Sequence, residues 1–111
     1  MLILAIIIFA LAAMLGMYLL TFILQNKNTP KGVTFTHGPL AVCGVLILII
    51  YSLIYSHKPI ISLSIFILAA FGGLILIHQD LTERSIPKWL ALGHGLAAII
   101  GLIALVIFTF V

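Results

Sequence analysis

The chain has 111 residues, of which 65% are hydrophobic and 6% are charged, and its formal net charge is +3 at pH 7. A mean hydropathy of +1.45 excludes an ordinary soluble domain, and five cations are too few for a nucleic-acid-binding surface. The single cysteine, Cys43, excludes an intramolecular disulfide and a zinc cluster built from cysteines.

Four apolar stretches dominate the chain, at roughly 2–24, 37–56, 59–78 and 89–111. Each has about the 20 residues that a helix needs to cross the hydrocarbon core of a bilayer. None shows the in-out alternation of a barrel strand, and only helices or closed barrels can cross lipid. We therefore predict an all-α membrane protein, a single transmembrane domain over residues 1–111 with four transmembrane helices.

The first and third predicted helices carry matching stripes of small residues at three- and four-residue steps. Small residues on one face of a helix let neighbouring backbones approach closely in lipid. The stripes are Phe9, Ala12, Ala13 and Gly16 in the first helix, and Phe66, Ala69, Ala70 and Gly73 in the third.

The first loop contains a start signal for the second helix. Thr29 is a suitable N-cap and Pro30 suits the first helical position, where its missing N–H is not needed; Pro87 has the same place before the fourth helix. Pro39 complicates this boundary because a proline inside a helix removes a hydrogen bond. It favours an alternative in which the second helix begins near His37.

The third loop holds the only two acids, Asp80 and Glu83. Asp80 and Arg84 are four residues apart, a spacing at which they pair on a helix end. His78 ends the third helix and is either a histidine at headgroup level or a further member of a site.

The two halves of the chain match without a gap at a spacing of 57 residues. The segment from His37 to Gly44 corresponds to that from His94 to Gly101, with His, Gly, Ala and Gly in the same register. We interpret the chain as two tandem helical-hairpin repeats, about 1–57 and 58–111. Because each repeat has two helices, both enter the membrane in the same direction, which predicts a parallel bundle with a pseudo-two-fold axis along the membrane normal.

The loop charges predict an orientation. Four cations lie in the first and third loops, whereas only Lys58 marks the other side. The positive-inside rule places these two loops in the cytoplasm and both termini outside, in a bacterial inner (cytoplasmic) membrane. The four cations are Lys27, Lys31, Arg84 and Lys88.

The duplicated histidines are the candidate functional residues. His37 and His94 head equivalent faces of small residues and are expected to confront each other across the bundle, an arrangement that suits haem b between two imidazoles. The expected haem site therefore comprises two ligands, four glycines that leave room for the ring and three cations that neutralise the propionates. These residues are His37, His94, Gly16, Gly44, Gly73, Gly101, Lys31, Lys88 and Arg84.

Such a protein is more an electron carrier than an enzyme, and it exchanges electrons with a quinone or a redox partner protein. Three alternatives remain open. One is zinc, copper or nickel bound by His37 and His94 with His78 as a third ligand. Another is a non-catalytic membrane accessory or assembly protein without a cofactor. The third is a pH-responsive element, since histidine titrates near neutrality. A homodimer in the lipid bilayer is compatible with each of these.

Three resemblances accompany these hypotheses. The Pro-Lys starts and the His-Gly motifs of the second and fourth helices resemble small uncharacterised bacterial four-helix inner-membrane proteins. That resemblance implies the architecture but no particular activity. The histidines beside small residues on bundle helices are similar to the site of membrane b-type cytochromes. The chain is also similar in length to small multidrug resistance transporters, but it lacks the acid in the first helix on which their proton exchange depends.

Overall fold

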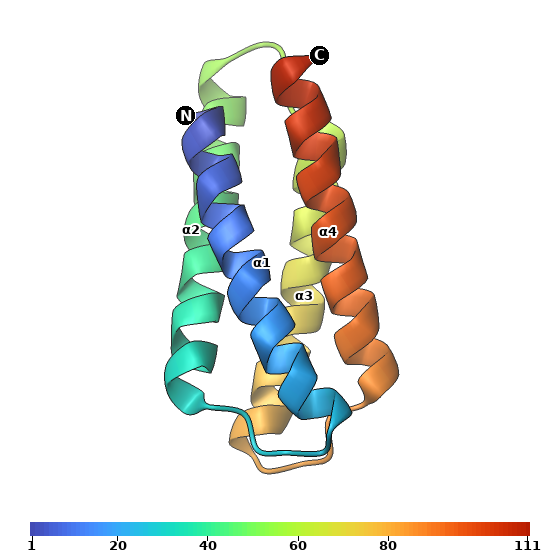
Figure 1. Ribbon diagram of the computed structural model, residues 1–111. Coiled ribbons are helices and arrows are strands. Elements are labelled where there is room, and N and C mark those ends of the chain that lie inside the picture. Colours follow the sequence, from blue (N-terminus) through green and yellow to red (C-terminus); the bar gives the residue numbers. More distant parts are fainter.

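The computed structural model describes residues 1–111 as four antiparallel helices joined by short loops (Figure 1). The helices are α1 (Leu2–Leu24), α2 (Lys31–Ile54), α3 (Ile60–Leu81) and α4 (Lys88–Phe110). All four are long and apolar enough to cross a membrane, and the bundle measures 44 × 21 × 19 Å. The all-α, four-span prediction is therefore confirmed.

The bundle has the parallel pseudo-two-fold arrangement predicted from the repeat. The helices α1 and α3 run in one direction and α2 and α4 in the other, so that both termini lie at one end (Figure 1). Repeat-related residues meet at the centre, where the rings of Phe9 and Phe66 stack with centroids 3.8 Å apart and planes 2° apart. Leu48 and Leu105, another repeat-related pair, are fully buried beside them.

The interior is narrow, so most large apolar side chains face outward. Leu53, Ile61 and Leu68 are at least 70% exposed, as expected for side chains in contact with lipid. The buried stripes carry small residues instead, including Ala5, Ala12, Ala69 and Ala91. Because lipid is as apolar as leucine, close backbone packing rather than burial of large side chains holds such a bundle together.

The start of α2 differs from the sequence prediction in two respects. The helix begins at Lys31 and continues through Pro39, so the alternative start near His37 is wrong. Pro39 removes one hydrogen bond, and the bonded turns on either side are sufficient to keep the helix continuous. Thr29 makes no capping bond, because Pro30 occupies the N-cap position and the Thr29 hydroxyl points to another helix.

The ends of α1 and α3 share one conformation, which reflects the repeat. Asn26 and Glu83 are repeat-related and both adopt the left-handed region with φ 56°. In each case the following amide donates back to a carbonyl five residues earlier, Lys27 to Phe22 O and Arg84 to Gln79 O, both at 2.9 Å. This is the Schellman pattern that closes a helix C-terminus.

Candidate functional site: a repeat-related histidine pair

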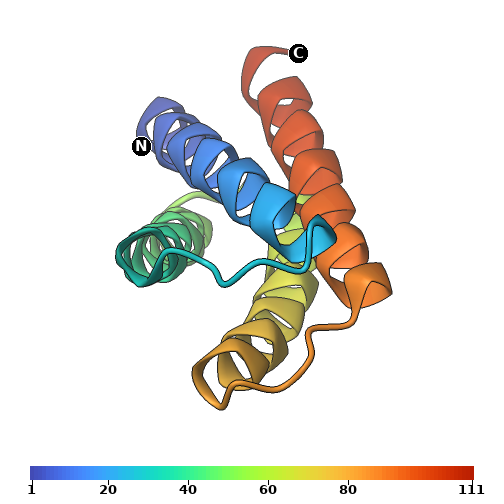
Figure 2. The ribbon, with the colours of Figure 1, turned by 60° about the horizontal axis from the view of Figure 1, so that its bottom comes forward.

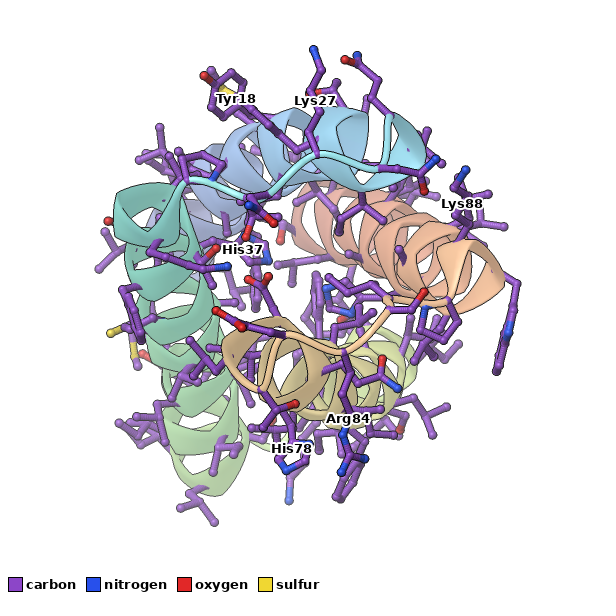
Figure 3. All side chains as sticks on the ribbon, turned by 90° about the horizontal axis from the view of Figure 1, so that it is seen from below. Tyr18, Lys27, His37, His78, Arg84 and Lys88 are labelled. Carbon is purple, nitrogen blue, oxygen red and sulfur yellow. The ribbon has the colours of Figure 1, made fainter.

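His37 and His94 lie opposite each other across the bundle axis, near the end that carries the first and third loops. Each comes from the second helix of its hairpin, α2 or α4, and each side chain is partly buried. The ring centroids are 6.2 Å apart and the ring planes are inclined by 84°. Figure 3 shows His37 directed into the bundle from α2. The structure therefore brings together the two histidines singled out by the sequence repeat.

Both imidazoles are fixed by the same kind of hydrogen bond. His37 Nδ1 lies 2.8 Å from Ala12 O, and His94 Nδ1 lies 2.8 Å from Ala69 O. A carbonyl oxygen only accepts, so Nδ1 carries the proton and donates in both rings. Nε2 makes no hydrogen bond within the chain, and in the neutral ring it keeps its lone pair. A backbone carbonyl on Nδ1–H is the usual partner of a histidine that binds a metal through Nε2.

Gly16 and Gly73 allow each imidazole to lie directly against the first helix of its hairpin. A Cβ atom at Gly16 would stand 2.9 Å from His37 Cε1, and one at Gly73 would stand 3.0 Å from His94 Cε1. The sequence interpretation assigned the space at these glycines to a porphyrin ring. In the structure these two glycines instead make room for the histidine rings themselves.

Gly44 and Gly101 also differ from their expected role. A Cβ atom at Gly44 would stand 2.7 Å from the Phe9 ring, and one at Gly101 would stand 3.1 Å from the Phe66 ring. The space at these glycines is thus filled by the stacked aromatic pair and is not open to a cofactor. Phe9 and Phe66 instead fill the interior between the histidines and the end of the bundle that carries the termini, a role that the sequence interpretation missed. Their positions in matching stripes of the two repeats were the signal that could have indicated it.

Of the three predicted cations, one lies over the histidine end of the interior. Lys31 Nζ donates to Asp80 Oδ1 at 2.7 Å and to Thr29 Oγ1 at 2.9 Å. The side chains of Arg84 and Lys88 point away from the bundle (Figure 3). They do not converge on the pair.

The predicted pairing of Asp80 with Arg84 is wrong. The helix ends at Leu81, and the left-handed turn at Glu83 carries Arg84 away from the i, i+4 position. Asp80 instead contacts the first repeat, where it accepts from Thr29 Oγ1 at 2.6 Å and from Lys31. A polar cavity of about 660 Å³ lies here between the two loops, and its lining includes Thr29, Lys31 and Asp80 together with Lys27, Glu83 and Arg84.

His78 is not part of the site. Its side chain is exposed and points outward from α3 (Figure 3). No three His, Cys, Asp or Glu side chains lie close enough together to bind one metal ion. The structure thus does not bring His78 together with His37 and His94. His57 lies at the opposite end of the bundle, where its ring is 4.5 Å from that of Phe108.

The separation of the two imidazoles fits a single bridging metal. With a metal–nitrogen bond of about 2 Å and a ring nitrogen roughly 1.2 Å from its centroid, two imidazoles on opposite sides of one ion have centroids about 6.4 Å apart. The observed value is 6.2 Å. Two neutral imidazoles and no carboxylate form a poor closed site for zinc but the usual axial pair for haem iron. The donor set and the centroid separation thus match those of a haem iron with two imidazole ligands, whereas the space beside Gly16, Gly44, Gly73 and Gly101 is filled by side chains of the bundle.

No family model, no curated protein and no solved structure matches this chain. Inference about its function consequently depends on the histidine pair and the groups that hold it.

Proposed function

We propose that this chain is a small membrane b-type cytochrome in which His37 and His94 bind one haem b and which carries electrons. The observation that supports it is the matched pair of imidazoles, each with Nδ1 bonded to its own hairpin and with centroids 6.2 Å apart. One such hydrogen bond is enough for a histidine with a structural role, but that role would not require a second imidazole facing the first. The repeat places two in register at one depth.

His37 and His94 would hold the haem iron, and two histidine ligands would favour electron transfer over oxygen chemistry, because they would leave no coordination position open. The haem supplies a one-electron redox centre when bound. The residues of the chain orient its ligands, with Ala12 O and Ala69 O fixing the tautomer and the ring plane. Phe9 and Phe66 fill the interior between the histidines and the end of the bundle that carries the termini. The cations Lys27, Lys31 and Arg84 line the polar cavity at the loop end, where they would neutralise the propionates of such a group.

The proposal includes a location and a class of partner. Four of the five cations lie at the end with the first and third loops, which favours a bacterial inner membrane with these loops in the cytoplasm and both termini outside. Electrons would come from a quinol or a protein partner, since the chain has no second redox group of its own.

The test is an absorption and electron paramagnetic resonance spectrum of the purified protein in detergent. We expect a Soret band and a low-spin ferric signal typical of two imidazole ligands. His37→Ala and His94→Ala should each abolish the low-spin signal. His57→Ala and His78→Ala are matched controls, because these histidines lie outside the site, and they should leave both spectra unchanged. Colourless protein that also fails to bind added haemin would overturn the proposal and favour the accessory-protein alternative.

A further inference from the structure

Each imidazole is positioned within its own hairpin, whereas the site requires two hairpins. His37 on α2 bonds to Ala12 on α1, and His94 on α4 bonds to Ala69 on α3. These bonds orient each ring but do not set the distance between the rings. That distance depends on contacts between the first repeat and the second.

Two such contacts lie on either side of the histidine pair. On one side, Phe9 stacks on Phe66 and reaches Gly44, seven residues and about 10 Å along α2 from His37. On the other side, Asp80 contacts Lys31, which lies six residues and about 9 Å before His37. The histidines therefore lie midway between an aromatic contact and an ionic one.

The ionic contact joins the looser of the two inter-repeat interfaces. The helices α1 and α4 pack against each other more extensively than α2 and α3 do. At the loop end, α2 and α3 are also further apart than α1 and α4 (Figure 2). The repeat alone gives no such contact, because Ile23 is the residue that corresponds to Asp80 and Lys88 corresponds to Lys31. Asp80, an acid without a counterpart in the first repeat, is thus found where packing alone holds the helices least.

The carboxylate of Asp80 is well placed to hold α2 against α3. Its side chain is 12% exposed, and each oxygen accepts a short hydrogen bond, one from Lys31 Nζ at 2.7 Å and one from Thr29 Oγ1 at 2.6 Å. Lys31 Nζ also donates to Thr29 Oγ1, which closes the network. Such a charge-assisted network is stronger and more directional than an isolated surface pair.

We infer that Asp80 is a positioning residue, whose contacts with Lys31 and Thr29 hold α2 against α3 and so set the separation of His37 and His94. Its effect on a haem depends on the proposed function, whereas its effect on helix spacing does not. The experiment therefore measures the two separately.

The first measurement is the distance between spin labels in the protein without haem. In a Cys43→Ser background, one label pair at Phe35→Cys and Ile75→Cys spans α2 and α3. These are exposed positions. We expect Asp80→Ala to broaden and lengthen this distance distribution, and the charge-swapped pair Asp80→Lys with Lys31→Asp to restore it.

The repeat supplies a matched control for this measurement. Tyr18 and Leu92 correspond to Ile75 and Phe35, are also exposed, and span α1 and α4. Labels at Tyr18→Cys and Leu92→Cys should report no change in Asp80→Ala. Glu83→Gln removes the other acid, which makes no side-chain bond, and should leave both distances unchanged. Equal broadening of both label pairs would indicate general loosening and overturn the positioning role.

The second measurement is haem binding by the same variants. We expect Asp80→Ala to weaken haem affinity by about tenfold, equivalent to about 1.4 kcal/mol, and to convert part of the low-spin signal to high spin. The swapped pair should recover most of both. If the wild type binds no haem, the proposed function fails while the label distances still decide the role of Asp80. Unchanged distances in Asp80→Ala would overturn the inference even in a haem-binding protein.

Discussion

At the scale of single residues, the glycines of this bundle differ in what surrounds them. Gly44 and Gly101 are repeat-related and face the rings of Phe9 and Phe66, but at different distances, 2.7 Å and 3.1 Å from an added Cβ atom. The Phe rings are stacked on each other, so neither can move away freely. Gly95, in contrast, has nothing within 4 Å. A glycine-to-alanine substitution therefore meets a different environment at each of these three positions.

Gly44→Ala should lower the free energy of unfolding by about 1–3 kcal/mol, because the added methyl group overpacks a fixed ring. Gly101→Ala should cost less, since 3.1 Å requires a shift of only a few tenths of an ångström. Gly95→Ala is the control and should stabilise the helix by up to about 1 kcal/mol. Unfolding in mixed micelles by titration with sodium dodecyl sulfate measures all three. A larger loss for Gly101→Ala than for Gly44→Ala would contradict the packing described here.

The residues of the candidate site could be named from the sequence in part. The histidine pair followed from the 57-residue spacing, because a duplicated ionisable group in a membrane helix is costly unless it is used. The partners of Asp80 could not be predicted. They lie 49 and 51 residues away, and nothing in the spacing of the sequence relates them. The hydrogen bonds from the histidines to Ala12 and Ala69 were equally hidden, since any residue supplies a carbonyl.

At the scale of helices, the two C-terminal caps at Asn26 and Glu83 show how one backbone shape tolerates different residues. Both residues have φ 56°. Asn is among the residues that adopt the left-handed region readily, whereas Glu is not. The second repeat therefore carries more strain at its cap than the first.

Exchanging the two cap residues should change stability in opposite directions. Glu83→Asn should raise the free energy of unfolding by about 0.5–1 kcal/mol, and Asn26→Glu should lower it by a similar amount. Thermal unfolding followed by circular dichroism in detergent compares the variants. Glu83→Gln serves as the control for lost charge without relief of strain and should have little effect. A loss of stability in Glu83→Asn would show that the Glu83 side chain has a role that its backbone does not reveal.

The helix boundaries show that hydropathy locates a helix more accurately than it locates the ends of that helix. Hydropathy located all four helices, but it began the second one too late, because six residues before His37 are less apolar than the rest. The helix nevertheless extends to Lys31, where Pro30 stops it and Lys31 finds Asp80. The first turn of α2 therefore makes a tertiary contact, and the sequence of that turn alone does not predict it.

At the scale of the whole molecule, the fold was more predictable than the site. Span length and the repeat together required parallel hairpins around an axis, because a membrane permits few alternatives. The relative packing of the helix pairs was not predictable. The two inter-repeat interfaces are equivalent in the repeat but unequal in the structure (Figure 2).

The orientation of the molecule is testable with a cysteine that reacts from one side. In a Cys43→Ser background, Ser85→Cys lies in the third loop and Ser56→Cys lies in the loop after α2. With the cation-rich loops in the cytoplasm, a membrane-impermeant maleimide added to intact cells should label Ser56→Cys and spare Ser85→Cys. Labelling after lysis of the cells controls for reactivity. The opposite pattern would reverse the proposed topology.

The attachment of each imidazole to its own hairpin has an evolutionary consequence. A single ancestral hairpin would have carried half of the pair with its ring already oriented, and self-association of two copies would have completed it. In such a homodimer any acid would appear at both interfaces between the two hairpins, because the two copies have the same sequence. Only after the two copies were fused could one edge gain Asp80 while the other kept Ile23. A gene fusion would thus permit what the symmetry of a homodimer forbids, a change at one of the two inter-repeat interfaces without the same change at the other.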